Sequence, residues 1–392
     1  MDRPLIALEP APSYDPALVE RAVGAAFKAV ERDGALIRPG AKVFVKVNNL
    51  SSRRDPSSAV NTHPAVLRAV LRLLLERGAA PVVGDDVNAG REDPFRAPGL
   101  RAVCDELAVK LVNLREAGFR EVRCEGRRLR SLFVARAALE ADVILNVPKL
   151  KTHSLTGLTC AVKNMFGVIP AGERHRLHGL FPLNDPFCEA LVDIFAAVRP
   201  FVTICDAVVA MEGEGPSGGR PRSVGAILAS RDAIALDAAA ASLVGIEPLA
   251  VATTRIGHER GLGRADLEGV AFSGAQPGAF RIPDFKHSAL AFSFLRKRLP
   301  ASLYAWVQGQ LVLTPKVVRS RCTFCGDCLA ICPPRAVHER AGTAWVDAGA
   351  CIHCLCCHEA CPSLAIRLRR TRFGRLAHAL AGAWARVSGR AG

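Results

Sequence analysis

The sequence predicts an α/β protein, with a large domain on a mainly parallel sheet and a small α+β domain after it. Three observations support this. Short apolar strands alternate with helix-like stretches over residues 1–285, the pattern of a parallel sheet with crossover helices. An apolar, basic stretch follows at 286–315, and eight cysteines in a repeated spacing then fall within 316–368. A chain of 392 residues is long enough for two such domains.

The elements of the large domain follow from its apolar runs and its helix signals. Buried strands are expected at 42–48, 81–84, 109–114, 143–147 and 201–206. Pro64 opens an amphipathic helix that runs to Leu75, because proline suits the first turn of a helix. Residues 233–243 are rich in alanine and form a second helix, with Asp232 as its N-cap. In such a sheet, functional loops are expected at the strand ends.

The chain divides into four segments. Residues 1–285 form the α/β domain, 286–315 a helical connector, 316–368 the cysteine-rich domain and 369–392 a basic amphipathic tail. The tail carries apolar residues at helical spacing, with arginines between them: Phe373, Leu376, Leu380, Trp384 and Val387. Such a helix can lie on an anionic membrane surface or dock on protein, and both alternatives stay open.

The cysteine-rich domain carries one spacing twice. The pattern C-x2-C-x2-C-x3-C-P occurs with its cysteines at 322, 325, 328 and 332, and again with its cysteines at 351, 354, 357 and 361. This spacing is typical of ferredoxins that bind two [4Fe-4S] clusters, in which the fourth cysteine of each run ligates the other cluster. The alternative is a pair of structural zinc sites, but zinc ribbons need neither the third cysteine nor the proline.

The spacing therefore predicts two crossed ligand sets. The first cluster is expected on Cys322, Cys325, Cys328 and Cys361, and the second on Cys351, Cys354, Cys357 and Cys332. Cys356 lies between two ligands and is expected to be a bystander. An additional flavin or metal in the large domain is left open.

Charge is distributed unevenly along the chain. From residue 286 onward there are 16 Lys or Arg against 4 Asp or Glu, so this part carries +12 of the total net charge of +15. A basic cluster domain predicts an acidic redox partner protein, attracted electrostatically. No base-stacking motif accompanies the charge, so no nucleic acid is expected. Reduced cysteines, no apparent signal peptide and no long apolar run indicate a cytoplasmic protein, with peripheral contact at the inner membrane face as a further option through the tail.

Cationic side chains gather directly after the strand at 143–147. Lys149, Lys151 and His153 fall within five residues, and Lys163 follows shortly after. Because strand ends in α/β sheets bind ligands, an anionic small molecule is the expected guest, and a solvated basic loop is the alternative. His63 begins the helix at Pro64, where it can serve as a ligand, a proton shuttle or a cap. Lys46, His63, Lys151, His153 and Lys163 are the candidate catalytic residues.

One glycine motif points to a different cofactor but lacks the context for it. Residues 213–218 match G-x-G-x-x-G, which binds dinucleotides when a helix follows. Here a loop with Pro221 and another strand are expected, so the nicotinamide interpretation fails.

Several segments together resemble a prokaryotic family named domain of unknown function 362. The resemblance is carried by the sequence blocks at 42–48, 62–64, 143–153, 158–167, 211–218 and 229–237. Some members carry a similar C-terminal two-cluster module. The resemblance implies that one polar signature converges on a single site: Lys46, His63, Lys149, Lys151, His153, Lys163, Asn164, Glu212 and Asp237. It supplies no reaction.

Three functional hypotheses follow. The first is an iron–sulfur oxidoreductase that passes electrons between a redox partner and an anionic substrate or cofactor at the large domain. The second is an electron carrier whose large domain only docks a partner. The third is an iron–sulfur sensor or regulatory protein. The sequence favours the first two over the third.

Overall fold

The computed structural model describes residues 3–31, 37–87, 92–181, 184–287 and 313–371, together with residues 300, 303, 374 and 375. Most of the predicted connector (286–315) and of the predicted tail (369–392) therefore lies outside the described residues. Within the described part, no helix is both long enough and apolar enough to span a membrane.

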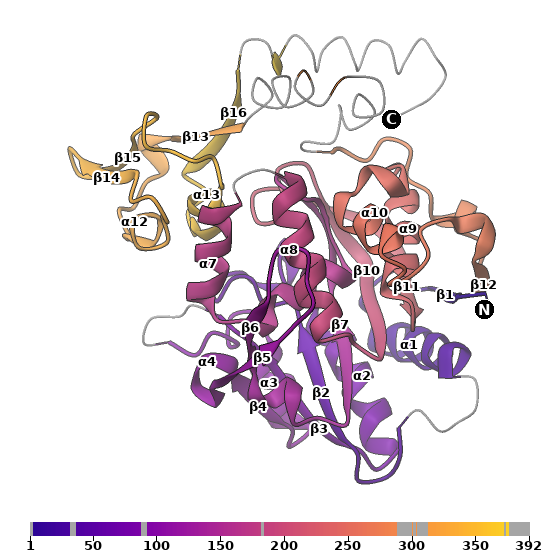
Figure 1. Ribbon diagram of the computed structural model, residues 1–392. Helices are drawn as coiled ribbons and strands as arrows, with labels where there is room; N and C mark the ends of the chain where they lie inside the picture. Colours follow the sequence, from indigo (N-terminus) through magenta and orange to yellow (C-terminus); the bar gives the residue numbers. More distant parts are fainter. Residues whose placement is uncertain are drawn as a thin grey trace.

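A ten-stranded sheet forms the centre of the large domain (Figure 1), and its main path is β12-β1-β11-β10-β7-β2-β3-β4. These strands are β1 (Leu5–Pro10), β2 (Lys42–Val47), β3 (Ala80–Asp85), β4 (Lys110–Asn113), β7 (Val143–Val147), β10 (Val202–Glu212), β11 (Arg220–Ser230) and β12 (Ala271–Gly274). Every pair from β10 to β4 is parallel, whereas β11 runs antiparallel to both of its neighbours. Two short strands extend the sheet beside β10, namely β8 (Lys149–His153) and β9 (Gly157–Thr159). The prediction of a mainly parallel α/β sheet is confirmed.

Helices cover both faces of this sheet and bury two apolar cores. One face packs against α1 (Pro16–Glu31), α2 (Pro64–Glu76) and α3 (Leu100–Glu106). The other packs against α6 (Ala161–Asn164), α8 (Asn184–Ala197), α9 (Ala233–Leu243) and α10 (Ala252–Glu259). Strand β2 shows why both faces need cover, because Val43, Val45 and Val47 enter the first core while Phe44 enters the second.

The remaining described elements lie at the margins of the large domain. They are α4 (Leu114–Ala117), the hairpin β5 (Phe119–Arg123) and β6 (Ser131–Ala135), α5 (Arg136–Leu139) and α7 (Ala171–Leu180). The expected helices at 64–75 and 233–243 both form, and Asp232 caps α9 by accepting from the backbone N–H groups of Ile234 and Ala235. The expected strand at 201–206 is longer than predicted, because it continues to Glu212 as β10. Strand β11, and not a helix, follows the glycine motif, as the sequence predicts.

The order of strands reverses between β2 and β7. The chain places β3 and β4 on one side of β2 and then returns to place β7 on the other. Where strand order reverses in a parallel sheet, the crossovers diverge and leave a crevice at the carboxyl ends of the strands. The loops that follow β2 and β7 therefore border a natural ligand site.

The small cysteine-rich domain is built from two equivalent halves. Its strands pair as β13 (Leu313–Val317) with β16 (Ile366–Arg370), and as β14 (Val337–Arg340) with β15 (Thr343–Val346). Its two short helices are α12 (Asp327–Ala330) and α13 (Cys356–Ala360). Each half repeats the conformation of the other at a constant offset, including positive φ at Phe324 and His353 and again at Arg335 and Leu364.

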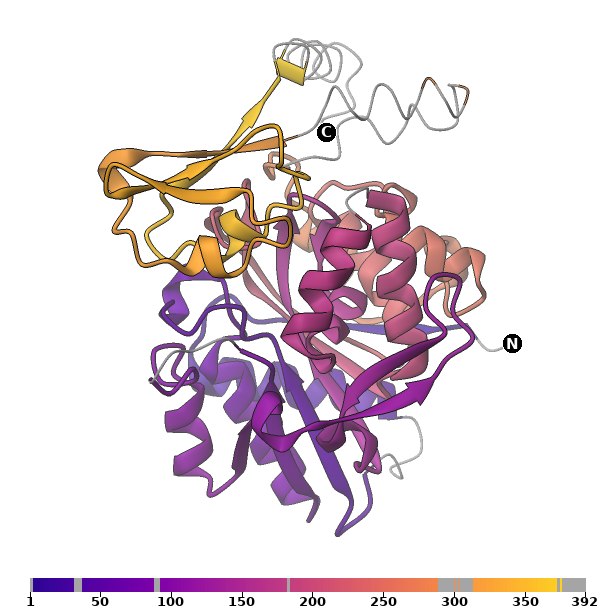
Figure 2. The ribbon, with the colours of Figure 1, turned by 60° about the vertical axis from the view of Figure 1, so that its left-hand side comes forward.

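The small domain lies against the large one (Figure 2). The backbone carbonyl of Glu359 accepts a hydrogen bond from Ser217 Oγ at 3.1 Å. His358 Nε2 lies 3.4 Å from the carbonyl oxygen of Glu214. On the first half, Asp327 pairs with Arg53 at 3.3 Å. Most of these contacts come from α13, so this helix is the part of the small domain closest to the strand ends.

Candidate functional site

A polar cavity of about 50 Å³ opens at the carboxyl ends of β2 and β3, beside β8 and β9. Its polar lining consists of Lys46, Asn48, Asn49, Asp85, Lys151, His153, Thr159, Lys163, Asn164, Arg174 and Glu359. Four of the five candidate catalytic residues are therefore brought together, and His63 is not among them. The cavity lies at the reversal of strand order, where the fold itself predicts a ligand site.

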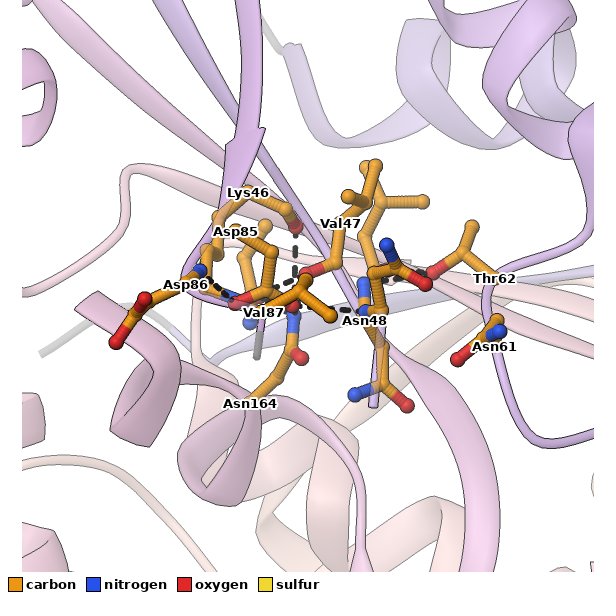
Figure 3. A network of polar contacts seen from close by, with 12 residues as sticks. Lys46, Val47, Asn48, Asn61, Thr62, Asp85, Asp86, Val87 and Asn164 are labelled. Atoms are coloured by element: carbon orange, nitrogen blue, oxygen red, sulfur yellow. Dashed lines mark hydrogen bonds and ion pairs between the residues drawn. The ribbon is translucent and has the colours of Figure 1, made fainter. Parts of the chain in front are cut away.

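The floor of the cavity is a buried ion pair. Lys46, at the end of β2, places its Nζ 2.8 Å from Asp85 Oδ1 and donates to the carbonyl of Val47 (Figure 3). Asp85 also accepts hydrogen bonds from the backbone N–H groups of Asn49 and Asp86. Burial lowers the pKa of Lys46, and the nearby Asp85 charge opposes that shift. The pair is thus held in place by its surroundings. Because its two charges largely cancel, this part of the cavity wall is nearly neutral.

Gly167 gives this ion pair the space it needs. A Cβ at this position would lie 2.4 Å from Asp85 Oδ1 and 2.6 Å from Lys46 Nζ. We expect Gly167→Ala to lower the free energy of unfolding by about 2–3 kcal/mol, because a buried pair must separate or shift. Anaerobic urea unfolding measures this effect.

Gly172 on α7 is the matched control, because nothing lies within 4 Å of a Cβ added there. We expect Gly172→Ala to leave stability unchanged or to raise it by up to about 1 kcal/mol, since alanine favours a helix. Equal unfolding free energies for the two variants would contradict the steric argument.

His153 presents a donor to the cavity. Its Nδ1 accepts hydrogen bonds from the backbone N–H groups of Leu155 and Thr156, so the ring proton resides on Nε2. That Nε2 has no hydrogen-bond partner and lies 3.4 Å from Glu359 Oε1. Burial holds the pKa of His153 well below its usual range, and the charge of Lys163 adds to this effect. His153 is therefore a neutral, oriented N–H donor.

Lys151 and Lys163 make the cavity electropositive. Lys151 Nζ donates to the carbonyl of Val60 at 2.7 Å, and its side chain is buried. Burial, reinforced by the charge of Lys163, lowers the pKa of Lys151 to about 7. Within the described residues, Lys163 Nζ has no hydrogen-bond acceptor and lies over the Phe166 ring at 4.7 Å. Burial raises the pKa of Glu359, and the nearby charges of Lys163, His358, Lys151 and Arg174 oppose that shift. Because more cationic than anionic side chains surround this part of the cavity, an anionic ligand is favoured.

His63 and Lys149 belong to a second buried network. Lys149 Nζ lies 2.9 Å from Asp206 Oδ2 and also contacts the Tyr14 hydroxyl. The other Asp206 oxygen accepts from Tyr14, and the His63 ring stacks on the Tyr14 ring at 3.4 Å. His63 Nδ1 caps α2 by accepting from the backbone N–H of Ala65, and burial lowers the pKa of His63 to about 4. These residues join β10 to the start of α2 and do not line the cavity.

Asp237 and Glu212 of the polar signature hydrogen-bond to backbone groups and do not line the cavity. Asn164 does line it. Asp237 accepts hydrogen bonds from the first backbone N–H groups of α6, which carries Lys163. Glu212 accepts from the backbone N–H of Lys286. Asn164 Nδ2 donates to Asn146 Oδ1 at 2.7 Å, which fixes its own Oδ1 toward the cavity. The signature thus divides between the cavity and the elements that support it.

A second cavity lies in the small domain, and four cysteines line it: Cys322, Cys325, Cys328 and Cys361. Burial raises the pKa of the Cys328 thiol to about 11, and the charges of Cys361, Cys325 and Cys322 add to the shift. The backbone N–H groups of Ala365 and Ala344 point at the sulfurs of Cys361 and Cys322, at 3.2 and 3.5 Å. Such N–H groups stabilise thiolates.

The charges of neighbouring cysteines also raise the pKa of the thiols in the second run. Cys354 and Cys332 act on Cys351, and Cys354, Cys351, Cys332 and Cys328 act on Cys357. Burial is the largest cause of the raised pKa at both Cys351 and Cys357. The backbone N–H of Ala336 points at Cys332 Sγ at 3.2 Å, and this contact is the counterpart of the one at Cys361.

No group of three or more His, Cys, Asp or Glu side chains within the described ranges is arranged to hold a metal ion. A cubane differs from a lone ion because each thiolate binds a different iron, which places the sulfurs farther apart. All of the described cysteines are free thiols.

The two halves of the small domain differ where the second half meets the large domain. Position for position, α13 carries Cys356, His358 and Glu359 where α12 carries Asp327, Leu329 and Ala330. Glu359 is the residue that enters the wall of the polar cavity. The two halves of the small domain thus differ in sequence where the second half contacts the polar cavity.

Comparison with known proteins identifies the large domain. Residues 43–242, about half of the chain, match the family described as Domain of unknown function (DUF362). The chain belongs to this family. It is also 31% identical, over 231 residues, to a thylakoid-associated protein of Synechocystis sp., a match that spans 58% of this chain and 71% of the relative. The family assignment by sequence resemblance is confirmed.

Two solved structures are similar to parts of the DUF362 chain. One is the lactate racemase apoprotein from Thermoanaerobacterium thermosaccharolyticum, with 12% identity and a TM-score of 0.36 over 59% of this chain and 55% of that one. The other is a protein from Thermotoga maritima, with 17% identity and a TM-score of 0.33 over 53% of each chain. The matches span about half of each solved chain and are too partial to bear on activity.

Sequence reasoning missed several residues of this family member's site. Asp85 was visible as the acidic end of a strand, which is a usable signal for a site. Arg174 and Glu359 gave no such signal, because only the tertiary fold brings α7 and α13 to the strand ends. Neither residue could be told from an ordinary surface charge.

Proposed function

We propose that this protein carries two [4Fe-4S] clusters in its small domain and exchanges electrons with an anionic substrate or cofactor in the polar cavity. The observation that carries the proposal is Glu359. It lies two residues from Cys357 in α13 and lines the cavity together with Lys151 and Lys163. A candidate cluster ligand and a candidate ligand site are thus joined through one helical turn.

The cysteine arrangement supports the cofactor. Four thiols of the first crossed set surround one cavity, and backbone N–H groups point at sulfurs in both sets. These residues would hold the clusters, which supply one-electron transfers when bound. Crossed ligation also makes cluster binding part of the folding of the small domain.

The exposure of the cysteines indicates on which side of the small domain a redox partner would bind. The first set includes an exposed cysteine, Cys325, beside the exposed Phe324, whereas no cysteine of the second set is exposed. An external redox partner would approach the first set, and the guest in the cavity would face the second. The basic balance of this half favours an acidic partner protein.

Anaerobic purification followed by iron, sulfide and EPR analysis tests the cofactor, and about eight irons per chain are expected. Lys163→Met tests the electron path. The variant should keep its iron and its EPR signals but lose reoxidation by the small-molecule fraction of a cell extract. Lys28→Met is the matched control, because Lys28 is exposed on α1 and does not line the cavity. A zinc-loaded protein without iron, or a Lys163→Met variant that reoxidises normally, would contradict the proposal.

The pKa of Lys151 predicts a pH dependence for anion binding. Lys163 and Lys149 favour its neutral form, whereas Glu359 and Asp85 favour its charged form. Because its pKa is about 7, Lys151 is charged below pH 7 and attracts an anion, and it loses its charge above pH 7. Affinity for a small test carboxylate, glycolate, should therefore fall by up to about tenfold per pH unit above 7. Calorimetry measures this fall, and Lys151→Met should bind weakly with no slope in this range.

A further inference from the structure

Unpartnered polar atoms are concentrated in the polar cavity. Seven of the sixteen buried side-chain atoms that have no hydrogen-bond partner in the described structure belong to residues that line it, and two of these seven, His153 Nε2 and Glu359 Oε1, lie 3.4 Å from each other. Three are donors or can donate: His153 Nε2, Thr159 Oγ1 and Arg174 Nε. Four are acceptors: Asn48 Oδ1, Asn49 Oδ1, Asn164 Oδ1 and Glu359 Oε1. Since folded proteins leave few buried polar groups unpaired, such a concentration marks a place where something else binds.

The acceptors are fixed by their own hydrogen bonds. Asn164 Nδ2 donates to Asn146 Oδ1, and Asn49 Nδ2 donates to the carbonyl of Pro94 at 3.0 Å. Each amide nitrogen is thereby engaged, so each amide oxygen is left free. A simple anion would satisfy the donors but would leave these oxygens unpaired. The guest must therefore bring hydrogen-bond donors as well as negative charge.

The size of the cavity limits the guest. One water-sized group needs about 10–15 Å³ of this kind of volume, so 50 Å³ holds about three to five such groups. That range suits a carboxylate of two or three carbons.

The positive charges in the cavity indicate which hydrogen-bond donor the ligand carries, an ammonium group or a hydroxyl group. Lys163 has no counter-ion within hydrogen-bond distance in the described structure, and Lys151 lies close to it. A guest ammonium would be repelled by both side chains. A hydroxyl donates equally well without adding positive charge.

We propose that the cavity binds a small hydroxycarboxylate, with its carboxylate on Lys163, His153 and Arg174 and its hydroxyl on the Asn49 and Asn164 oxygens. This inference rests on the proposed function and names the class of its guest. The carboxylate uses the three cavity donors on α6, β8 and α7. The hydroxyl uses the two fixed amide acceptors.

Isothermal calorimetry on the full-length, cluster-loaded protein tests the inference, with glycolate, acetate, glycine and inorganic phosphate as probes. Glycolate should bind at least tenfold more tightly than acetate, because acetate leaves the amide oxygens unpaired. Glycolate should also bind more tightly than phosphate. It should bind more tightly than glycine as well, because Lys163 repels the ammonium group of glycine. Lys163→Met should abolish glycolate binding, and Lys28→Met should not change it.

Several results would overturn this inference. They are equal affinity for acetate and glycolate, tighter binding of phosphate or glycine, an unaffected Lys163→Met variant, or no binding of any probe. Iron and sulfide analysis of the same samples separates the two proposals. Loaded clusters without glycolate binding would contradict only the hydroxycarboxylate, whereas glycolate binding by a protein that takes up no iron would contradict only the cluster function.

Discussion

Cys361→Ala should remove the cluster that we propose on Cys322, Cys325 and Cys328, although Cys361 lies in the other cysteine run. The reason is the crossed arrangement, in which Cys361 lines the cavity of the first set. We expect the iron content to fall from about eight to about four per chain, with loss of one of two EPR signals. Cys124→Ser is the control, because Cys124 lies in the large domain beside the hairpin β5–β6.

Double variants distinguish crossed from sequential ligation. If ligation is crossed, Cys322→Ala/Cys361→Ala should lose no more iron than Cys361→Ala alone, because both residues serve one cluster. Cys351→Ala/Cys361→Ala should lose nearly all iron, because it damages both clusters. The opposite pattern would mean that each run binds its own cluster, and the crossed sets would be wrong.

Lys149→Met should cause a larger loss of stability than Gly167→Ala. Lys149 and Asp206 are both fully buried and lie 2.9 Å apart. Removing the ammonium group leaves a buried carboxylate without its counter-ion, which costs about 3–5 kcal/mol. The hydrogen bonds from Tyr14 and from the His63 backbone N–H to Asp206 remain and keep the loss within that range. Urea unfolding under anaerobic conditions measures it.

Lys28→Met is the matched control for this substitution. Lys28 is exposed on α1, so its replacement should change the free energy of unfolding by less than about 0.5 kcal/mol. A similarly small effect for Lys149→Met would contradict the argument that the buried ion pair stabilises the fold.

Local signals explain how much of the fold was predictable. Strand β2 and helix α2 were recognisable because apolar periodicity and Pro64 are properties of neighbouring residues. The length of β10 was not, because its second half is held by pairing with β11, eight or more residues away. Pairing between distant segments is hard to predict from the sequence of either segment alone.

The candidate site was predictable only in part for a similar reason. Lys151, His153 and Lys163 follow a strand closely, so their gathering could be expected. Lys149 is only two residues from Lys151, yet its side chain joins Asp206 and Tyr14 in a separate network. Spacing alone could not separate the two lysines, because β8 pairs irregularly with β10 between Lys149 and Lys151.

Glu359 makes the lining of the polar cavity depend on two parts of the chain. It is the only lining residue of the polar cavity that lies outside the segment matched by the DUF362 family, residues 43–242. Relatives without a cysteine-rich domain would need another side chain to complete this wall, or would leave it open. Removal of the cysteine-rich domain would therefore take away both the eight cysteines and the carboxylate of this cavity wall.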